Sequence, residues 1–252
     1  STAIMCLATA RAAGVRDICV FSPAREQGEV DSAVLAVCSL LGVNEVYRFG
    51  GAHAIAAAAY GSETIAPVDV VVGPGNAFVQ EAKRQLVGSV AIDSVAGPSE
   101  LVVIADESSN AELISLDLMA QGEHGDESLV VLIATGADIL DDVADRCASI
   151  GASLALVHAQ DLASAVALAD AIAPEHLQLM VADGLADELA ASVRNAGALF
   201  VGSNAATAFG DYVIGTNHVL PTGGSARFAQ ALSIDTFTRK MAEIRVPDHA
   251  VE

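Results

Sequence analysis

The chain has 252 residues, 53% of them hydrophobic and only 4% aromatic, and a formal net charge of −20. A chain of this length can bury a sizeable core in one large domain or in two smaller ones. The negative charge argues against nucleic acid or an anionic membrane surface as a partner and is compatible with a cationic small substrate, and no uncharged apolar stretch reaches the roughly 18 residues of a membrane span.

Helical and strand-like patterns alternate over the first part of the chain. Helices are expected over residues 2–15, 31–41, 52–60 and 77–86. Strands are expected between them, over residues 17–21, 45–49 and 68–72. Strands separated by helices of this length predict a parallel sheet built from βαβ units.

The alternation stops near residue 90 and starts again after Gly97-Pro98, so we place a domain boundary between Ala96 and Ser99. Strands are then expected over residues 101–104, 129–134, 153–157, 177–181 and 198–201. Helices are expected over residues 111–120, 138–148, 162–172 and 185–195. The expected fold is α/β, with two Rossmann-like parallel-sheet domains, residues 1–98 and 99–252, and the active site between them.

The adjacent pair Glu175-His176 follows Pro174 at a predicted junction between a helix and a strand, where catalytic groups are often presented. A carboxylic acid and an imidazole have reference pKa values of about 4.3 and about 6.5, which burial can bring closer to neutrality. The pair is therefore a candidate for proton transfer. The alternative is a proline-initiated turn with two solvated polar residues.

Two further segments carry candidate ligands. Gln121 and His124 are three residues apart at the end of a predicted helix, so they share a face and could grip one ion, as in half of a zinc site. The loop 210–224 adds Asp211 and His218. A polar helix end and an Asx-type turn with a surface histidine are the respective alternatives. Ser99 offers a hydroxyl to a substrate or caps the end of a strand.

The turn Gly73-Pro74-Gly75-Asn76 lies between a predicted strand and a predicted helix, where backbone N–H groups and the helix dipole can hold an anion such as a pyrophosphate. It is not the GxGxxG dinucleotide fingerprint, so alone it indicates only a possible phosphate turn. The four scattered cysteines, without a CxxC pair, predict buried thiols in a reducing compartment. They are Cys6, Cys19, Cys38 and Cys147.

Taken together, these segments resemble the histidinol dehydrogenase family. No single segment is decisive, but they occur in the family's order along nearly the whole chain, and the ordered set is specific. The matching segments are residues 73–86, Ile92-Asp93, residues 96–100, Ala105-Asp106, residues 117–124, Pro174-Glu175-His176-Leu177 and the stretch 210–222.

The resemblance implies a cytoplasmic, homodimeric enzyme that uses zinc and NAD to oxidise L-histidinol to L-histidine through an aldehyde, in histidine biosynthesis. It implies that Gln121, His124 and Asp211 bind both metal and substrate. It also implies that Glu175 and His176 are the acid/base residues. His176 takes the hydroxyl proton, and Glu175 activates the water that attacks the aldehyde.

The remaining roles implied by the resemblance are contacts. Ser99, His176 and His218 match substrate contacts, and Asn76 matches a cofactor contact. His53 stands where the family has a cofactor-contacting Gln, and an imidazole can still make one hydrogen bond there. Residues 1–98 are then the cofactor domain, and residues 99–252 the metal and substrate domain.

The family also has an N-terminal segment with a cofactor-contacting Tyr, and a C-terminal tail with a substrate-contacting Glu and a zinc-binding His from the partner subunit. This chain starts after the first and ends before most of the second, and His249 does not match the tail histidine. Two alternative functions therefore stay open. One is a related dehydrogenase for another small diol or amino alcohol, and the other is a catalytically silent metal- or nucleotide-binding core.

Overall fold

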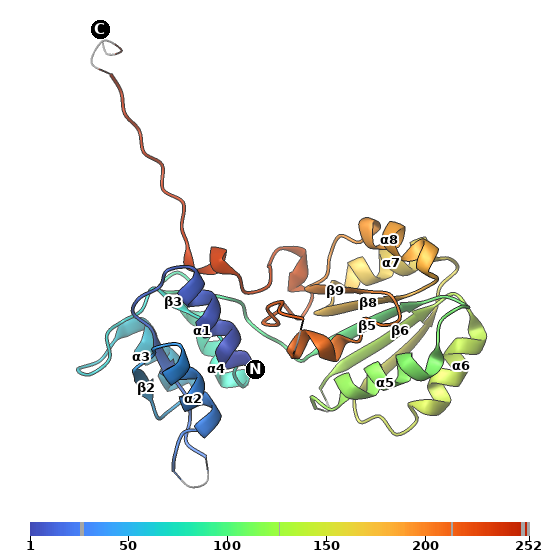
Figure 1. Cartoon of the computed structure of the whole chain (residues 1–252), viewed down its shortest axis with the longest axis horizontal. Helices are drawn as coiled ribbons and strands as arrows, with labels where there is room; N and C mark the ends of the chain where they lie inside the picture. Colours follow the sequence, from blue (N-terminus) through green and yellow to red (C-terminus); the bar gives the residue numbers. More distant parts are fainter. Residues whose placement is uncertain (26–27, 126, 213, 248–249, 251–252) are drawn as a thin grey trace.

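A five-stranded parallel sheet forms the centre of the second part of the chain (Figure 1). The computed structural model describes residues 1–25, 28–125, 127–212, 214–247 and 250. The sheet has the order β7-β6-β5-β8-β9, and its parallel strands are as expected from the sequence. The strands are β5 (Glu100–Ala105), β6 (Leu129–Ala134), β7 (Ser153–His158), β8 (His176–Met180) and β9 (Ala198–Val201).

Helices cover both faces of this sheet, which makes it doubly wound. Helices α5 (Ala111–Gly122) and α6 (Ala137–Arg146) pack on one face, and α7 (Leu162–Ile172) and α8 (Asp183–Ser192) on the other. Alternate residues of β5 serve the two faces: Leu101 and Val103 join one apolar cluster, whereas Val102 and Ile104 join the other. Burial on both sides explains why these strands have continuous apolar sequences.

The first part of the chain is also α/β, but its strands form two separate pairs. Among the described residues, β1 (Cys19–Phe21) pairs with β2 (Glu45–Tyr47), and β3 (Val70–Val71) pairs with β4 (Ala91–Ile92), each in parallel. The sequence predicts one parallel sheet here, whereas the structure has two separate two-stranded parallel sheets. The helices are α1 (Thr2–Ala12), α2 (Ser32–Leu40), α3 (Gly51–Tyr60) and α4 (Ala77–Leu86).

A buried ion pair holds the turn between β3 and α4. The ammonium group of Lys83 donates to the carboxylate of Asp93 and to the backbone oxygen of Gly73, at 3.0 Å from the latter. Asp93 in turn accepts the Gly73 N–H at 2.8 Å. The two side chains are 1% and 4% exposed. Two charged side chains thus hold the backbone of Gly73, at the start of the turn 73–76 that the sequence indicates as a phosphate turn.

The C-terminal segment returns from the large sheet to the first part of the chain (Figure 1). The side-chain amide of Asn217 donates to the Met5 backbone oxygen and to the Thr9 hydroxyl. Three short 3-10 helices lie along this segment, at Thr207–Asp211, Ser225–Arg227 and Ile234–Phe237. No helix in the described residues is long and apolar enough to cross a membrane.

Candidate active site

Glu175 and His176 lie at the amino end of β8, at the junction that the sequence predicts. Helix α7 ends at Ile172, and Ala173 takes the left-handed conformation with φ 53°. Because a residue before proline avoids the helical region, Pro174 helps to end α7 there and turns the chain into β8. The side chains of Glu175 and His176 are buried, so the alternative of two solvated polar residues is wrong.

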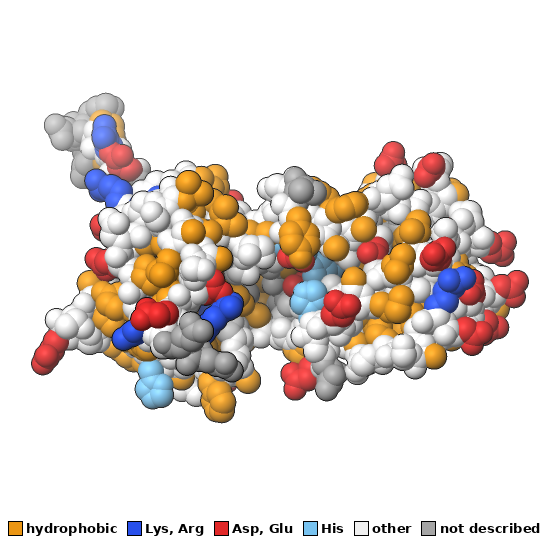
Figure 2. Space-filling view, turned by 60° about the horizontal axis from the view of Figure 1, so that its bottom comes forward, with side chains coloured by type: hydrophobic (Ala, Val, Ile, Leu, Met, Phe, Trp, Pro, Cys, Tyr) orange, Lys and Arg blue, Asp and Glu red, His pale blue; other side chains and the backbone are white. Residues whose placement is uncertain are grey.

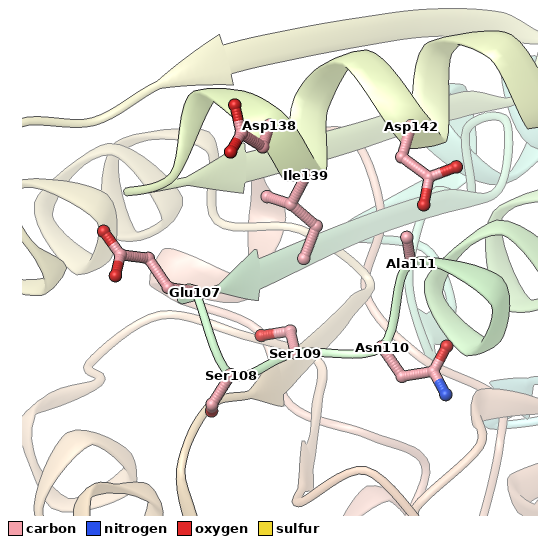
Figure 3. Close-up of a pocket in the computed structure, with 8 residues that line it drawn as sticks. All are labelled: Glu107, Ser108, Ser109, Asn110, Ala111, Asp138, Ile139 and Asp142. Atoms are coloured by element: carbon pink, nitrogen blue, oxygen red, sulfur yellow. The ribbon is translucent and has the colours of Figure 1, made fainter.

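The opposite, carboxyl edge of the sheet is less suited to a ligand, although open α/β sheets usually bind there at the point where strand order reverses. That point lies between β5 and β8. The protein's own groups fill it: Asp106 accepts the Ala182 N–H at 3.0 Å, and the Ser109 hydroxyl donates to the Met180 oxygen. The hollow beside it, of about 510 Å³, has Glu107, Asp138 and Asp142 on its walls (Figure 3). These carboxylates would repel an anionic dinucleotide.

A cavity of about 350 Å³ brings together four of the predicted site residues. Gln121 and His124 reach it from the end of α5, Asp211 from the end of a 3-10 helix, and His218 from the following loop. In the space-filling view, histidine side chains gather beside acidic ones at the surface near the middle of the molecule (Figure 2). Residues more than 80 positions apart in the sequence thus meet at one place.

His218 connects this cavity to the buried pair. Its Nε2 lies 2.6 Å from Nε2 of His176, and the two rings stack with centroids 4.7 Å apart. On its other side, the His176 Nδ1 lies 2.9 Å from the Glu100 backbone oxygen. A carbonyl only accepts, so Nδ1 of His176 bears the hydrogen and its Nε2 offers a lone pair. His218 then donates from Nε2, and its own Nδ1 is left buried without a partner among the described residues.

The environment of Glu175 shifts its pKa upward. Burial raises the pKa to about 7, the nearby Glu100 carboxylate adds to this, and hydrogen bonds from the Glu100 N–H and the Ser99 hydroxyl oppose it. His176 shifts the other way: burial, and then His218, lower its pKa to about 4. Between these values the carboxyl group is mostly protonated and the imidazole is neutral. Ser99 therefore lies next to Glu175.

The donors around the cavity suit a cation in part. The Nδ1 of His124 lies 3.1 Å from the backbone oxygen of Gln121, and this hydrogen bond leaves Nε2 free as a ligand. The side-chain Nε2 of Gln121 is buried without a partner among the described residues, whereas the amide oxygen is the atom that could bind a cation. No three His, Cys, Asp or Glu residues in the described part of the chain form a metal cluster. A metal held here would therefore need the Gln121 amide and a donor from elsewhere.

The two predicted cofactor contacts lie away from this cavity. Asn76 is the N-cap of α4, and its side-chain oxygen accepts the Val79 N–H at 3.1 Å. His53 is exposed on α3. Neither residue lines the cavity. His249 lies outside the described residues.

Sequence reasoning gave no role to two buried or half-buried carboxylates. Asp117 lies one helical turn before Gln121, and its pKa is raised by burial, while Gln178 and the Thr207 N–H donate hydrogen bonds to it. Asp117 stands within the matching segment 117–124, and a lone Asp in the apolar stretch of α5 is a second signal. Glu100 makes the contacts with Glu175 and His176 given above, and it stood within a matching segment without an assigned function.

Stability is expected to depend on pH through Glu175. Its folded-state pKa is raised from 4.5 to about 7, so its contribution to stability is fully present below about 4.5 and is lost as pH rises through about 7. The loss should be of the order of 3 kcal/mol. Urea unfolding at about pH 5 and about pH 8 measures it. In Glu175→Gln the difference in the free energy of unfolding between the two pH values should become small. A difference as large as in the wild type would contradict the raised pKa of Glu175.

Gly210 is expected to be required for the position of His218. A Cβ atom at Gly210 would collide with the His218 ring. Gly210→Ala should therefore displace the ring and lower catalytic efficiency on the order of 10- to 100-fold. Gly184→Ala is the matched control, because a Cβ there meets nothing within 4 Å and Gly184 lies in α8. Equal activity of the two variants would show that the contact is unimportant.

The fold and the cavity define an α/β protein in which a buried acid–imidazole pair lies beside donors suited to a cation. The comparisons with known proteins narrow this class. The family model described as "Histidinol dehydrogenase" matches residues 1–252, so the chain belongs to the histidinol dehydrogenase family.

Named relatives agree. The chain is 45% identical over 260 residues to the histidinol dehydrogenase of Agrobacterium fabrum, and the aligned region covers 98% of this chain and 60% of that relative. It is 44% identical over 253 residues to the histidinol dehydrogenase of Chlorobium luteolum, and the aligned region covers 95% of this chain and 57% of that relative. The crystal structure of histidinol dehydrogenase from Elizabethkingia anophelis superposes with a TM-score of 0.86 at 34% identity, over 93% of this chain and 57% of that one. The chain thus spans less than two thirds of the length of these relatives.

Proposed function

We propose that the protein containing this chain oxidises L-histidinol to L-histidine, with zinc and NAD, in the cytoplasm. The observation that supports this most directly is the meeting of Gln121, His124, Asp211 and His218 around one cavity, together with the contact of His218 with His176. Family membership supplies the substrate class, and the negative net charge of −20 suits an amine substrate.

His176 acts as the base for the alcohol. Its Nδ1–H is held by the Glu100 oxygen, so the basic nitrogen is Nε2, which accepts a hydrogen bond from His218 in this structure and would exchange that bond for the substrate hydroxyl. A neutral imidazole is needed to accept the hydroxyl proton, and the lowered pKa of His176 keeps it neutral at physiological pH. His218 and Ser99 orient the substrate at this edge.

Glu175 serves the second half of the reaction. With a pKa of about 7, a large fraction of it is ionised near neutral pH, so that it can take a proton from the water that attacks the aldehyde. Gln121, His124 and Asp211 would hold the metal. Bound zinc would polarise and orient the amino alcohol, and NAD would accept the two hydrides.

The remaining parts of the proposal concern assembly. Residues 1–98, with Asn76 and His53, would form the cofactor domain, and residues 99–252 the metal and substrate domain, with the active site between them. A homodimer would supply the fourth metal ligand. Four free cysteines, of which Cys6, Cys38 and Cys147 are buried, suit a reducing compartment.

NADH formation from L-histidinol by the full natural protein tests the proposal. We expect NADH release in a ratio of about two per histidine formed, and about one zinc per chain by elemental analysis. Removal of the metal should abolish turnover, and added zinc should restore it. A panel of other amino alcohols and diols is the control for substrate. Turnover of a diol in place of histidinol would favour a related dehydrogenase, and a metal-free, inactive protein would favour a silent core.

A further inference from the structure

Glu100, which has no assigned role so far, makes three hydrogen bonds with Glu175 and His176. Its backbone N–H donates to the Glu175 carboxylate at 3.1 Å, and its side-chain Oε2 accepts the Glu175 N–H at 3.3 Å. Its backbone oxygen accepts from Nδ1 of His176 at 2.9 Å. The residue at the start of β5 thus holds both members of the pair at the start of β8, the neighbouring strand.

The second carboxylate oxygen of Glu100 reaches a different part of the chain. Oε1 accepts the Gly223 N–H at 3.2 Å. Gly223 ends the loop 210–224, which carries Asp211 and His218. One half-buried side chain therefore joins the segment of the acid/base pair to the loop that supplies three of the residues lining the cavity. Next to it, the Gly97 N–H donates to the Thr222 hydroxyl and joins the segment before β5 to the same loop.

The chemistry of these bonds requires a carboxylate. Both partners of the Glu100 side chain are N–H donors, so both of its oxygens must accept. A glutamine has the same shape but only one accepting oxygen, and its NH₂ group would face one of the two donors. The neighbourhood of Glu175 makes a second carboxylate costly here, which argues that the residue does something a neutral one would not.

We propose that Glu100 is a positioning residue, which fixes the Glu175–His176 pair relative to the loop that carries His218. This inference rests on the proposed function for its kinetic consequence, but not for its structural one. Because misplacement by about 1 Å can cost on the order of 100-fold in rate, the expected effect falls on kcat rather than on substrate binding.

The test replaces Glu100 with Gln in the full natural protein and compares it with Glu188→Gln, an exposed control on α8. We expect Glu100→Gln to lower kcat about 10- to 100-fold with KM for histidinol changed less than about threefold. Amide hydrogen exchange at Glu175 or Gly223, followed by NMR, should become faster in the same variant. Glu100→Asp keeps both accepting oxygens on a shorter side chain and should recover part of the lost rate.

Unchanged kcat together with unchanged exchange at both amides would overturn the proposal. If Glu100→Gln does not fold, Glu100→Asp takes its place: slower turnover with faster exchange supports the proposal, and wild-type values overturn it. The exchange measurement needs no turnover. If the wild-type protein does not oxidise histidinol, the proposed function is refuted. If substitution of Glu100 still speeds exchange at the Glu175 or Gly223 amide, the role of Glu100 stands.

Discussion

Replacing His176 with Ala is expected to lower kcat by a factor on the order of 1,000, the middle of the range for loss of a positioned general base. His176 is 4% exposed, its Nδ1 is committed to the Glu100 oxygen, and its Nε2 contacts His218, which lines the cavity. Water that enters the resulting hole would be a weaker and less ordered base. Stopped-flow or steady-state NADH formation measures the loss.

Two comparisons make the result specific to His176. His158→Ala is the control, because His158 is exposed at the end of β7, where its Nε2 contacts the Thr135 oxygen. His176→Asn keeps a polar side chain that can donate to the Glu100 oxygen, so it separates the loss of the base from the loss of that hydrogen bond. If His176→Ala keeps more than about a tenth of the wild-type kcat, proton transfer by His176 is not what limits the reaction.

The elements that the sequence predicted best are those with both a periodic pattern and a defined end. Helix α4 begins after Asn76, which caps it by accepting the Val79 N–H, and its predicted range 77–86 is the observed one. Strand β6 was found at its predicted range 129–134, since both of its faces are buried and the apolar run is unbroken. Local chemistry decides such boundaries.

The parts that the sequence did not predict depend on long-range pairing. Strand β4 has only two residues, Ala91 and Ile92, which is too short for any periodic signal. In residues 1–98 the strands form two pairs because of which strands meet, and hydrophobic periodicity does not tell which strands pair. A sheet can be predicted from its strands before their partners are known.

The candidate site shows the same limit. Gln121 and His124 share a helix end and could be paired from spacing alone, whereas the loop 210–224 suggested Asp211 and His218 as candidates and only the family resemblance joined them to the helix-end pair. The contact between His176 and His218 joins residues 42 positions apart. Glu100 and Glu175 are 75 positions apart and exchange hydrogen bonds in both directions. The contacts of Glu100 with Glu175 follow from the pairing of β5 with β8, and the contact of His176 with His218 follows from the position of the loop 210–224; no local pattern encodes either.

Breaking the buried pair of Lys83 and Asp93 is expected to cause the largest loss of stability in the chain. Both side chains are nearly inaccessible to solvent, so removing one partner leaves an uncompensated charge in the interior. Lys83→Met or Asp93→Asn alone should lower the free energy of unfolding by about 3–5 kcal/mol. The double variant removes both charges and should be less destabilised than the sum of the two.

Urea unfolding of the single and double variants measures this coupling, and Arg84→Met is the matched control. Arg84 is the next residue on α4, and its ion pair with Glu81 is exposed, so its loss should leave stability near that of the wild type. The effect should also reach the cofactor. Lys83 and Asp93 both bond to Gly73, so the double variant should loosen the turn that leads to Asn76 and raise KM for NAD more than KM for histidinol. Additive losses with an unchanged KM for NAD would mean that the pair stabilises the fold without shaping this turn.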